Sequence, residues 1–455
     1  MLERSRAEPQ TGSTYGQYVN PQWMRLLDVL QMNVTYTRCR GAELETADGR
    51  VILDFLSGYC VHNLGHNHPR LVEALKRELD REGPAMLQSH VSDLAGQLGE
   101  ALCVRAGGRL AKVFFASSGS EGIEAAIKFA RAHTRRAGIL YAAGAFHGLT
   151  CGALSLMTND FWKESFGPLL PGTEAVPFGD LGAVERKLAT KNFAALVLEP
   201  LQSEGGVNLP EGDYLASVER LCRRYGTLFV LDEVQTGLYR TGKFLAAHHF
   251  GVEPDMVVLA KALSGGLIPS SAVLMSDAIY QSVYGSLRRA IVHTSTYSEN
   301  SLAMRAGLAT IDILEQERLG QRAEKAGERL RGALTARLSK YEMVGEVRGL
   351  GLLNGIEFRP PRSHALRIPF LAFAHVHPAM FGQMLVMRLF RDHDILSQIC
   401  GNNFMVLKCA PPLVVNDRQI DQYLRSVEQV VELMHSSKAF WTEALGIGRR
   451  AMAMA

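Results

Sequence analysis

The sequence predicts an α/β protein built on a mostly parallel sheet. Between about residues 110 and 275, short apolar runs alternate with helical stretches; the runs are KVFFA, GILYAA, AALVLEP, TLFVLDEV and DMVVLA. Near-continuous apolar strands separated by helices are typical of a parallel sheet covered on both faces. After about residue 300 the pattern becomes one long charged helical stretch, 301–341, broken near Gly320. A large sheet domain and a smaller α+β domain, made from both ends of the chain, are therefore expected.

The other elements are predicted in chain order. MRLLDVLQM is a short amphipathic piece, ADGR at 47–50 is a turn signal, and VILDFLSG is an expected strand. HPRLVEALKRELDREG is a helical pattern ended by glycine. We expect residues 1–75 to contribute to the smaller domain, 76–330 to form the large domain, and 331–455 to complete the smaller one.

Composition narrows the class of protein. The 455-residue chain is 47% hydrophobic and 21% charged, which is ordinary for a globular protein, and its net charge of +3 argues against a general nucleic-acid binder. Its 7 cysteines are odd in number and lack metal-ligand spacing, a pattern typical of reduced thiols. The first residues contain no apolar signal segment, and no window offers the ~20 apolar residues of a membrane span. A cytoplasmic protein is expected.

Residues with chemical potential follow several predicted strands. Lys261 stands between an apolar run and a glycine-rich one, either as a solvated surface charge or as a lysine of lowered pKa ready to form a Schiff base. Gly119 and Ser120 begin a predicted helix. Its free N–H groups either are satisfied by an ordinary N-cap or bind an anion such as phosphate. Phe146 is a core residue beside a partly exposed His147, or Phe146 stacks on a flat ring.

Carboxylates end two further strands. Glu199 and Glu204 follow AALVL and by default are solvated loop charges. Asp232 and Glu233 interrupt an apolar strand, where a buried carboxylate needs a cationic partner.

A protonated pyridine nitrogen is one such partner for Asp232. Val234 could then touch the face of the ring, and Gln235 could reach a ring hydroxyl. A phosphate cradle, a stacking aromatic, a carboxylate for a ring nitrogen and a lysine for an aldehyde together describe pyridoxal 5′-phosphate. This combination predicts Lys261 and Asp232 as the catalytic residues.

The motifs, in this order, resemble the class III aminotransferases of PLP fold type I over residues 40–430. LDEVQTGLYRTGKF is similar to the cofactor signature of that family, and LAKALSGG to the segment with its Schiff-base lysine. The resemblance implies a seven-stranded, mostly parallel sheet and a ping-pong transfer of an amino group. HTSTYSEN is similar to a segment that crosses a homodimer, so Thr296 would hold the cofactor phosphate of the other subunit.

Within this class, the chain most resembles the ornithine, acetylornithine and putrescine aminotransferases. GYCVHNLGHNHP implies that Tyr59 lies at the substrate, and EPLQSEGGVNLP implies a gating glutamate at Glu204. Lys408 stands where the family has an arginine that pairs with this glutamate, and Leu149 where it has an arginine for a substrate carboxylate. Neither replaces a bidentate arginine clamp. The donor, expected to be glutamate, would be held by Lys408 or Arg348.

The stretch 359–396 is long and mixes Phe, Met, Leu, His and Arg. It is either a repacked small-domain core or an apolar, basic-rimmed entrance for a bulky or membrane-held substrate. With YGQYVNPQW and CGNNFMVLK, it resembles aminotransferases associated with hopanoid lipid biosynthesis, which implies a terminal aldehyde or ketone on a bulky lipid as acceptor. The alternatives are an ornithine, acetylornithine or diamine aminotransferase, or an aminomutase of the same fold.

Overall fold

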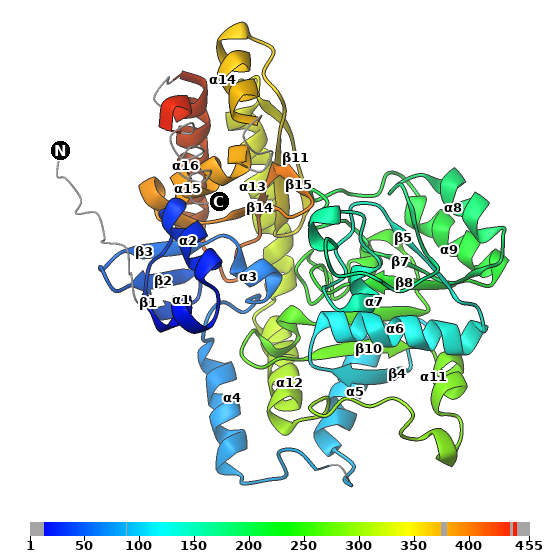
Figure 1. Cartoon of the computed structure of the whole chain (residues 1–455). Coiled ribbons are helices and arrows are strands. Elements are labelled where there is room, and N and C mark those ends of the chain that lie inside the picture. Colours follow the sequence, from blue (N-terminus) through cyan, green and yellow to red (C-terminus); the bar gives the residue numbers. More distant parts are fainter. Residues whose placement is uncertain (1–12, 88, 375–379, 437–439, 444–455) are drawn as a thin grey trace.

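The structure is a computed structural model that describes residues 13–87, 89–374, 380–436 and 440–443. The predictions for residues 1–12 and 375–379 therefore lie outside the described residues. Figure 1 shows a large sheet flanked by helices, and beside it smaller sheets and helices taken from early and late parts of the chain. Among the described helices, none is both long enough and apolar enough to cross a membrane.

Seven strands form the large sheet, in the order β4-β10-β9-β8-β7-β5-β6. They are β4 Lys112–Ala116, β5 Gly138–Ala142, β6 Thr173–Val176, β7 Phe193–Leu198, β8 Leu228–Asp232, β9 Met256–Leu259 and β10 Ser271–Met275. β5 to β9 pair in parallel, whereas β10 runs antiparallel to both of its neighbours. The predicted mostly parallel sheet is confirmed, and it includes all five predicted strands.

Helices cover this sheet on both faces (Figure 1). They are α5 Asp93–Ala106, α6 Gly119–Thr134, α8 Leu181–Leu188, α9 Tyr214–Tyr225, α11 Asp277–Tyr284 and α12 Ser301–Gln316, with short turns α7 Cys151–Leu154, η1 Asp160–Trp162, α10 Ala247–Phe250, η2 Lys261–Ser264 and η3 Leu287–Arg289. α6 lies very close to the sheet, because a Cβ at Gly122 would come within 2.6 Å of Val258 on β9. The start of α6 is thereby fixed at the edge where β4 ends.

The smaller α+β domain combines both ends of the chain. One sheet has the order β1-β2-β3-β13 and the other β11-β12-β15-β14. The strands are β1 Tyr36–Arg40, β2 Glu43–Thr46, β3 Val51–Asp54, β11 Val344–Leu350, β12 Leu353–Phe358, β13 Ile395–Leu396, β14 Gln398–Cys400 and β15 Asn403–Cys409. β13 pairs in parallel with β3, so a late segment completes the early sheet.

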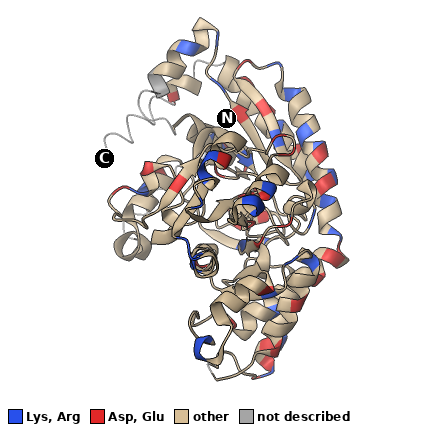
Figure 2. Ribbon diagram, turned by 90° about the vertical axis from the view of Figure 1, so that its right-hand side faces the viewer, with Lys and Arg blue, Asp and Glu red and all other residues tan. Residues whose placement is uncertain are grey.

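The remaining helices are α1 Thr14–Tyr18, α2 Pro21–Val29, α4 Pro69–Asp80, α13 Leu319–Leu338, α14 His364–Ala374, α15 Met380–His393 and α16 Asp417–Ser436. The long helical pattern breaks just before Gly320, where Arg318 has a φ of 51°. Residue 330, the expected domain boundary, falls inside α13. Acidic and basic residues are interspersed on the same helices (Figure 2).

The expected strand VILDFLSG ends early, at Asp54, and a left-handed turn, α3 Ser57–Cys60, follows it. Asp54 Oδ1 accepts hydrogen bonds from the main-chain N–H groups of Leu56, at 2.9 Å, and Ser57, at 2.7 Å. The four residues of α3 have φ values of 48°, 61°, 61° and 67°. Only one of them is glycine, so the turn costs energy that its surroundings must offset.

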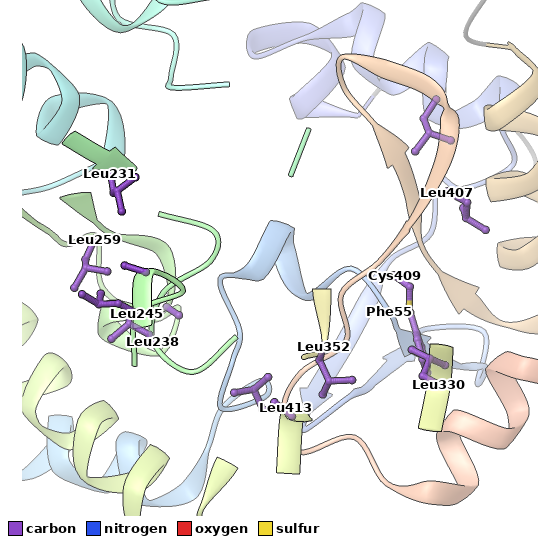
Figure 3. Packing of buried hydrophobic residues seen from close by; sticks show 14 of the residues in the cluster. Phe55, Leu231, Leu238, Leu245, Leu259, Leu330, Leu352, Leu407, Cys409 and Leu413 are labelled. Atoms are coloured by element: carbon purple, nitrogen blue, oxygen red, sulfur yellow. The ribbon is translucent and has the colours of Figure 1, made fainter. Parts of the chain in front are cut away.

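The largest hydrophobic cluster runs through both domains. Figure 3 shows it passing from Leu231 and Leu259 on the large sheet, through Leu238, to Leu352 and Leu413 on the side of the smaller domain. Within the stretch 359–396, α15 buries eight residues, six of them in this core. α14 differs, since Ile368 and Leu371 are exposed.

Candidate active site

A cavity of about 600 Å³ lies beyond the carboxyl ends of β4, β5, β8 and β9. Ligand sites of open α/β sheets lie at this edge, because the loops after the parallel strands meet there. The lining includes seven residues that the sequence predicts for the site: Gly119, Ser120, Phe146, His147, Asp232, Val234 and Lys261. Residues from four separate strand ends are thus brought together around one space.

The first turn of α6 forms one end of the cavity. Ser118 caps the helix by accepting a hydrogen bond from the N–H of Glu121 at 3.2 Å. Ser120 Oγ lies 2.7 Å from Thr150 Oγ1. A Cβ at Gly119 would lie 3.0 Å from two carbons of Val234, so only glycine leaves this wall open. A helix start with free N–H groups and a hydroxyl is suited to an anion.

Asp232 lies at the end of β8 and is buried. One of its oxygens is 2.8 Å from His147 Nδ1, and the other accepts the N–H of Val234 at 3.0 Å. These contacts fix the orientation of the carboxylate. His147 Nε2 is buried and has no hydrogen-bond partner among the described residues.

Lys261 begins η2 directly after β9 and lines the cavity. Its φ of 44° is left-handed, a conformation that side chains other than glycine rarely adopt. Burial lowers the pKa of Lys261 from its ordinary value, although the nearby carboxylate of Asp232 opposes this shift. The description of a solvated surface charge therefore does not fit this lysine.

A second group of predicted residues centres on Glu204 and Lys408, which form a buried ion pair. The same Glu204 oxygen accepts a hydrogen bond from Gln235 Nε2 at 3.1 Å, and the other oxygen accepts the N–H of Gly401 at 2.8 Å. The Lys408 ammonium also lies 4.8 Å from the ring centre of Tyr59. Burial would make Lys408 less basic, but the carboxylate of Glu204 more than reverses this effect and raises its pKa. Both partners are charged, and together they are neutral.

Two further carboxylates, Glu199 and Glu233, are buried and accept hydrogen bonds from neutral groups. For Glu233 the expected cationic partner was wrong, since no ion pair holds it among the described residues. Glu199 is buried, and it accepts the N–H groups of Phe146 at 3.2 Å and Ser203 at 2.9 Å; burial raises its pKa to about 7. Glu233 accepts the hydroxyl of Thr236 and two main-chain N–H groups at the start of α10, and burial likewise raises its pKa to about 7. Solvated loop charges were therefore the wrong expectation for Glu199, and also for the buried Glu204. The sequence did contain a signal for the burial of Glu199, because the apolar strand runs directly into Glu-Pro.

Three further predicted residues take no part in the hydrogen bonds and ion pairs described above. Thr296 is exposed and is not among the residues that line the cavity. Arg348 donates to the carbonyls of Gly206 and Val207 and pairs with two glutamates on the smaller domain, so its guanidinium is already engaged. Leu149 lines the cavity and is half exposed.

Comparison with known proteins identifies relatives over most of the chain. The chain is 36% identical to the aminotransferase PigE of Serratia sp. over 95% of its own length, but it spans only 54% of that longer protein. It is 34% identical to the putrescine aminotransferase of Pectobacterium atrosepticum, covering 93% of this chain and 89% of the relative.

Solved structures with the same fold include two aminotransferases. An ornithine aminotransferase of Toxoplasma gondii has a TM-score of 0.80 at 29% identity, covering 93% of this chain and 99% of that one. An acetylornithine aminotransferase of Elizabethkingia anophelis has a TM-score of 0.71 at 30% identity, covering 88% and 94%. The sequence model of the class III aminotransferases matches residues 27–431. The chain therefore belongs to the class III aminotransferases, pyridoxal-phosphate-dependent enzymes of fold type I.

Proposed function

We propose that this aminotransferase moves an amino group from glutamate to a terminal aldehyde or ketone in a ping-pong reaction. The observation that carries the proposal is the buried pair of Glu204 and Lys408, which we name the gate pair. One pocket must accept a donor with a carboxylate beside its amine and then an acceptor without one. Lys408 is neutralised by Glu204 when the substrate has no carboxylate there, and it becomes available when a donor carboxylate displaces Glu204. The pair can therefore serve both substrates in turn.

The residues around the cavity fit pyridoxal phosphate. Gly119 and Ser120 would hold the phosphate at the start of α6, and Phe146 and Val234 would enclose the ring. Asp232, fixed by its hydrogen bonds, would face the ring nitrogen. Gln235 would meet the ring hydroxyl, since Gln235 Oε1 is buried without a partner among the described residues; His147 completes the cofactor residues through its contact with Asp232.

The bound cofactor supplies an aldehyde that reacts with amines and a ring that takes up negative charge. Lys261 would bind that aldehyde in the resting enzyme. When its amine is free, Lys261 Nζ would be the base that removes the proton from the substrate carbon and the acid that returns it. Because burial lowers the pKa of Lys261, more of this amine is neutral near pH 7 than for an exposed lysine.

The gate pair and Tyr59 form the substrate end of the site. A donor carboxylate would take the place of Glu204 on Lys408 and lie beside the Tyr59 ring. Arg348 is not a suitable second cation, because carbonyls and two glutamates already occupy its donors. Lys408 is thus the residue we assign to the donor.

The acceptor we infer is bulky and apolar, of the hopanoid type. A row of aromatic side chains beside the cavity supports this inference. Phe146 at the cavity makes an edge contact with Trp162 at 5.5 Å, and Trp162 makes another with the exposed Phe161 at 5.0 Å. These rings give an apolar surface next to the cavity, against which an apolar body could pack.

The diamine alternative rests on the same gate pair. A diamine carries no carboxylate, so the neutral pair would not need to open for it. One relative, at 34% identity, is named a putrescine aminotransferase. An ornithine or acetylornithine aminotransferase would transfer the terminal amine, which has no carboxylate beside it, so the pair would stay closed for that substrate as for a diamine. An aminomutase would need no second carbonyl substrate.

The visible absorption spectrum of the purified enzyme, before and after glutamate is added, tests the proposal. We expect the yellow band of the bound cofactor to disappear with glutamate and to return with aldehydes, including bulky apolar ones. A band that responds to putrescine but not to glutamate would favour the diamine alternative. If no band forms after cofactor is supplied, the proposed function is wrong.

A further inference from the structure

The turn between β14 and β15 reaches from the smaller domain to the gate pair. This turn, Gly401–Asn402, holds Glu204 at two points. Gly401 N–H donates to the Glu204 carboxylate at 2.8 Å, and Asn402 N–H donates to the Glu204 carbonyl at 2.9 Å. β15 of the same hairpin carries Lys408, so one hairpin contacts both members of the gate pair.

The side chain of Asn402 fastens this turn to the large domain. Its Nδ2 donates to the carbonyls of Gly144 at 3.1 Å and Ala145 at 3.0 Å, directly before Phe146. Its Oδ1 accepts hydrogen bonds from Asn159 at 3.1 Å and from the Trp162 indole at 3.0 Å. Both donors and the acceptor of this amide are therefore used on loops of the large domain.

Glu204 cannot leave Lys408 without disturbing this turn, because separating the pair also breaks or displaces the contact from Gly401. A turn fastened by four side-chain hydrogen bonds resists that movement. We propose that Asn402 is a positioning residue that holds the gate pair closed and so sets the preference between substrates with and without a carboxylate beside the amine. This inference rests on the proposed gate function of Glu204 and Lys408.

The test compares Asn402→Ala with Asn403→Ala in the cofactor-loaded enzyme. Asn403 is the next residue of the same hairpin, and its side-chain oxygen accepts a local hydrogen bond from Met405. The affinity for glutarate, measured by calorimetry, reports gate opening without turnover, because this dicarboxylate has no amino, aldehyde or keto group that could react. We expect Asn402→Ala to bind glutarate about 3- to 10-fold more tightly than the unchanged enzyme, since it loses hydrogen bonds that keep the gate closed. Asn403→Ala should match the unchanged enzyme.

The kinetic counterpart is the ratio of kcat/KM for glutamate to that for putrescine or a straight-chain alkylamine. This ratio should rise by about the same factor in Asn402→Ala. A merely structural role would lower both values together and leave the ratio unchanged. If the enzyme uses neither putrescine nor an alkylamine as a substrate, the kinetic test is the glutamate concentration at half-maximal rate. This concentration should be lower in Asn402→Ala than in the unchanged enzyme.

Equal glutarate affinity in Asn402→Ala and the unchanged enzyme, or equal changes in both variants, would overturn the inference. If Asn402→Ala does not fold, Asn402→Ser replaces it, because serine stays uncharged but is too short to reach all four partners. An unchanged enzyme whose cofactor band ignores glutamate would contradict the proposed donor instead, and the glutarate comparison would still test Asn402.

Discussion

At the scale of single residues, Lys261 owes its chemistry to burial. Its ammonium is not part of any ion pair among the described residues, and the surrounding protein lowers its pKa. Without cofactor, the folded protein releases the Lys261 proton at a lower pH than the unfolded chain does. The unfolded chain therefore binds more protons between that lowered pKa and 10.5, and stability rises with pH in this window.

We predict that Lys261→Met lowers turnover by about 100-fold or more, because the proton-transfer group is lost. The same change should stabilise the cofactor-free protein at neutral pH and flatten the rise of stability with pH up to 10.5. Urea unfolding of both proteins across this pH range measures the effect.

The exposed Lys76 provides the control, and Lys76→Met should leave both activity and the pH slope unchanged. A pH slope that survives in Lys261→Met would mean that another group is responsible.

The site residues that could be predicted from the sequence are those that follow predicted strands. Lys261 and Asp232 are predictable because the alternation of strands and helices places the carboxyl ends of the parallel strands at one edge. Asn402 could not be predicted in the same way, because its partners are main-chain and side-chain groups of loops more than 200 residues earlier in the chain. Such contacts depend on how the domains meet, and no local pattern encodes this.

At the scale of elements, the left-handed turn α3 depends on Arg240. This arginine is fully buried and donates to the carbonyls of Leu352 and Pro411, to Ser57 Oγ and to Asn63 Oδ1. It thereby joins the cofactor signature to the turn that carries Tyr59 and to the smaller domain. The contacts offset the cost of the left-handed residues in α3.

We predict that Arg240→Met destabilises the enzyme by about 3 kcal/mol or more, because several buried acceptors lose their donor. Thermal unfolding measures this loss. Arg240→Lys should lie between, since one ammonium cannot reach all four acceptors at once.

Arg224→Met is the matched control. Arg224 is exposed and pairs with Glu185 on the surface, so its change should alter stability by less than about 1 kcal/mol. An Arg240→Met variant as stable as this control would show that α3 is held by other contacts.

Element direction was less predictable than element position. β10 was not singled out as a strand, and nothing in SAVLM indicates that it runs against the other strands. β6 is short and its two middle residues are exposed, so its apolar signal is weak. Strand VILDFLSG was predicted too long, because its apolar pattern continues past Asp54, whereas Asp54 caps the N–H groups of Leu56 and Ser57 and so ends the strand.

At the scale of the whole molecule, the segment around Thr296 needs an explanation that one subunit does not supply. Leu287, Ile291 and Tyr297 are all strongly exposed, and Thr296 lies outside the cavity. Exposed apolar residues in one segment are typical of a surface that another chain covers. We expect a homodimer in which Thr296 holds the cofactor phosphate of the opposite subunit.

Mixed dimers test this arrangement directly. Lys261→Ala removes the catalytic amine, and Thr296→Asp adds a charge that repels the phosphate. If Thr296 acts across the interface, a dimer with one subunit of each kind has one doubly defective site and one intact site. Refolding an equal mixture should then restore about one quarter of the wild-type activity, since about half of the dimers are mixed and each has one working site. If Thr296 acts within its own subunit, every site in every dimer carries a defect, and the mixture stays as inactive as its parents.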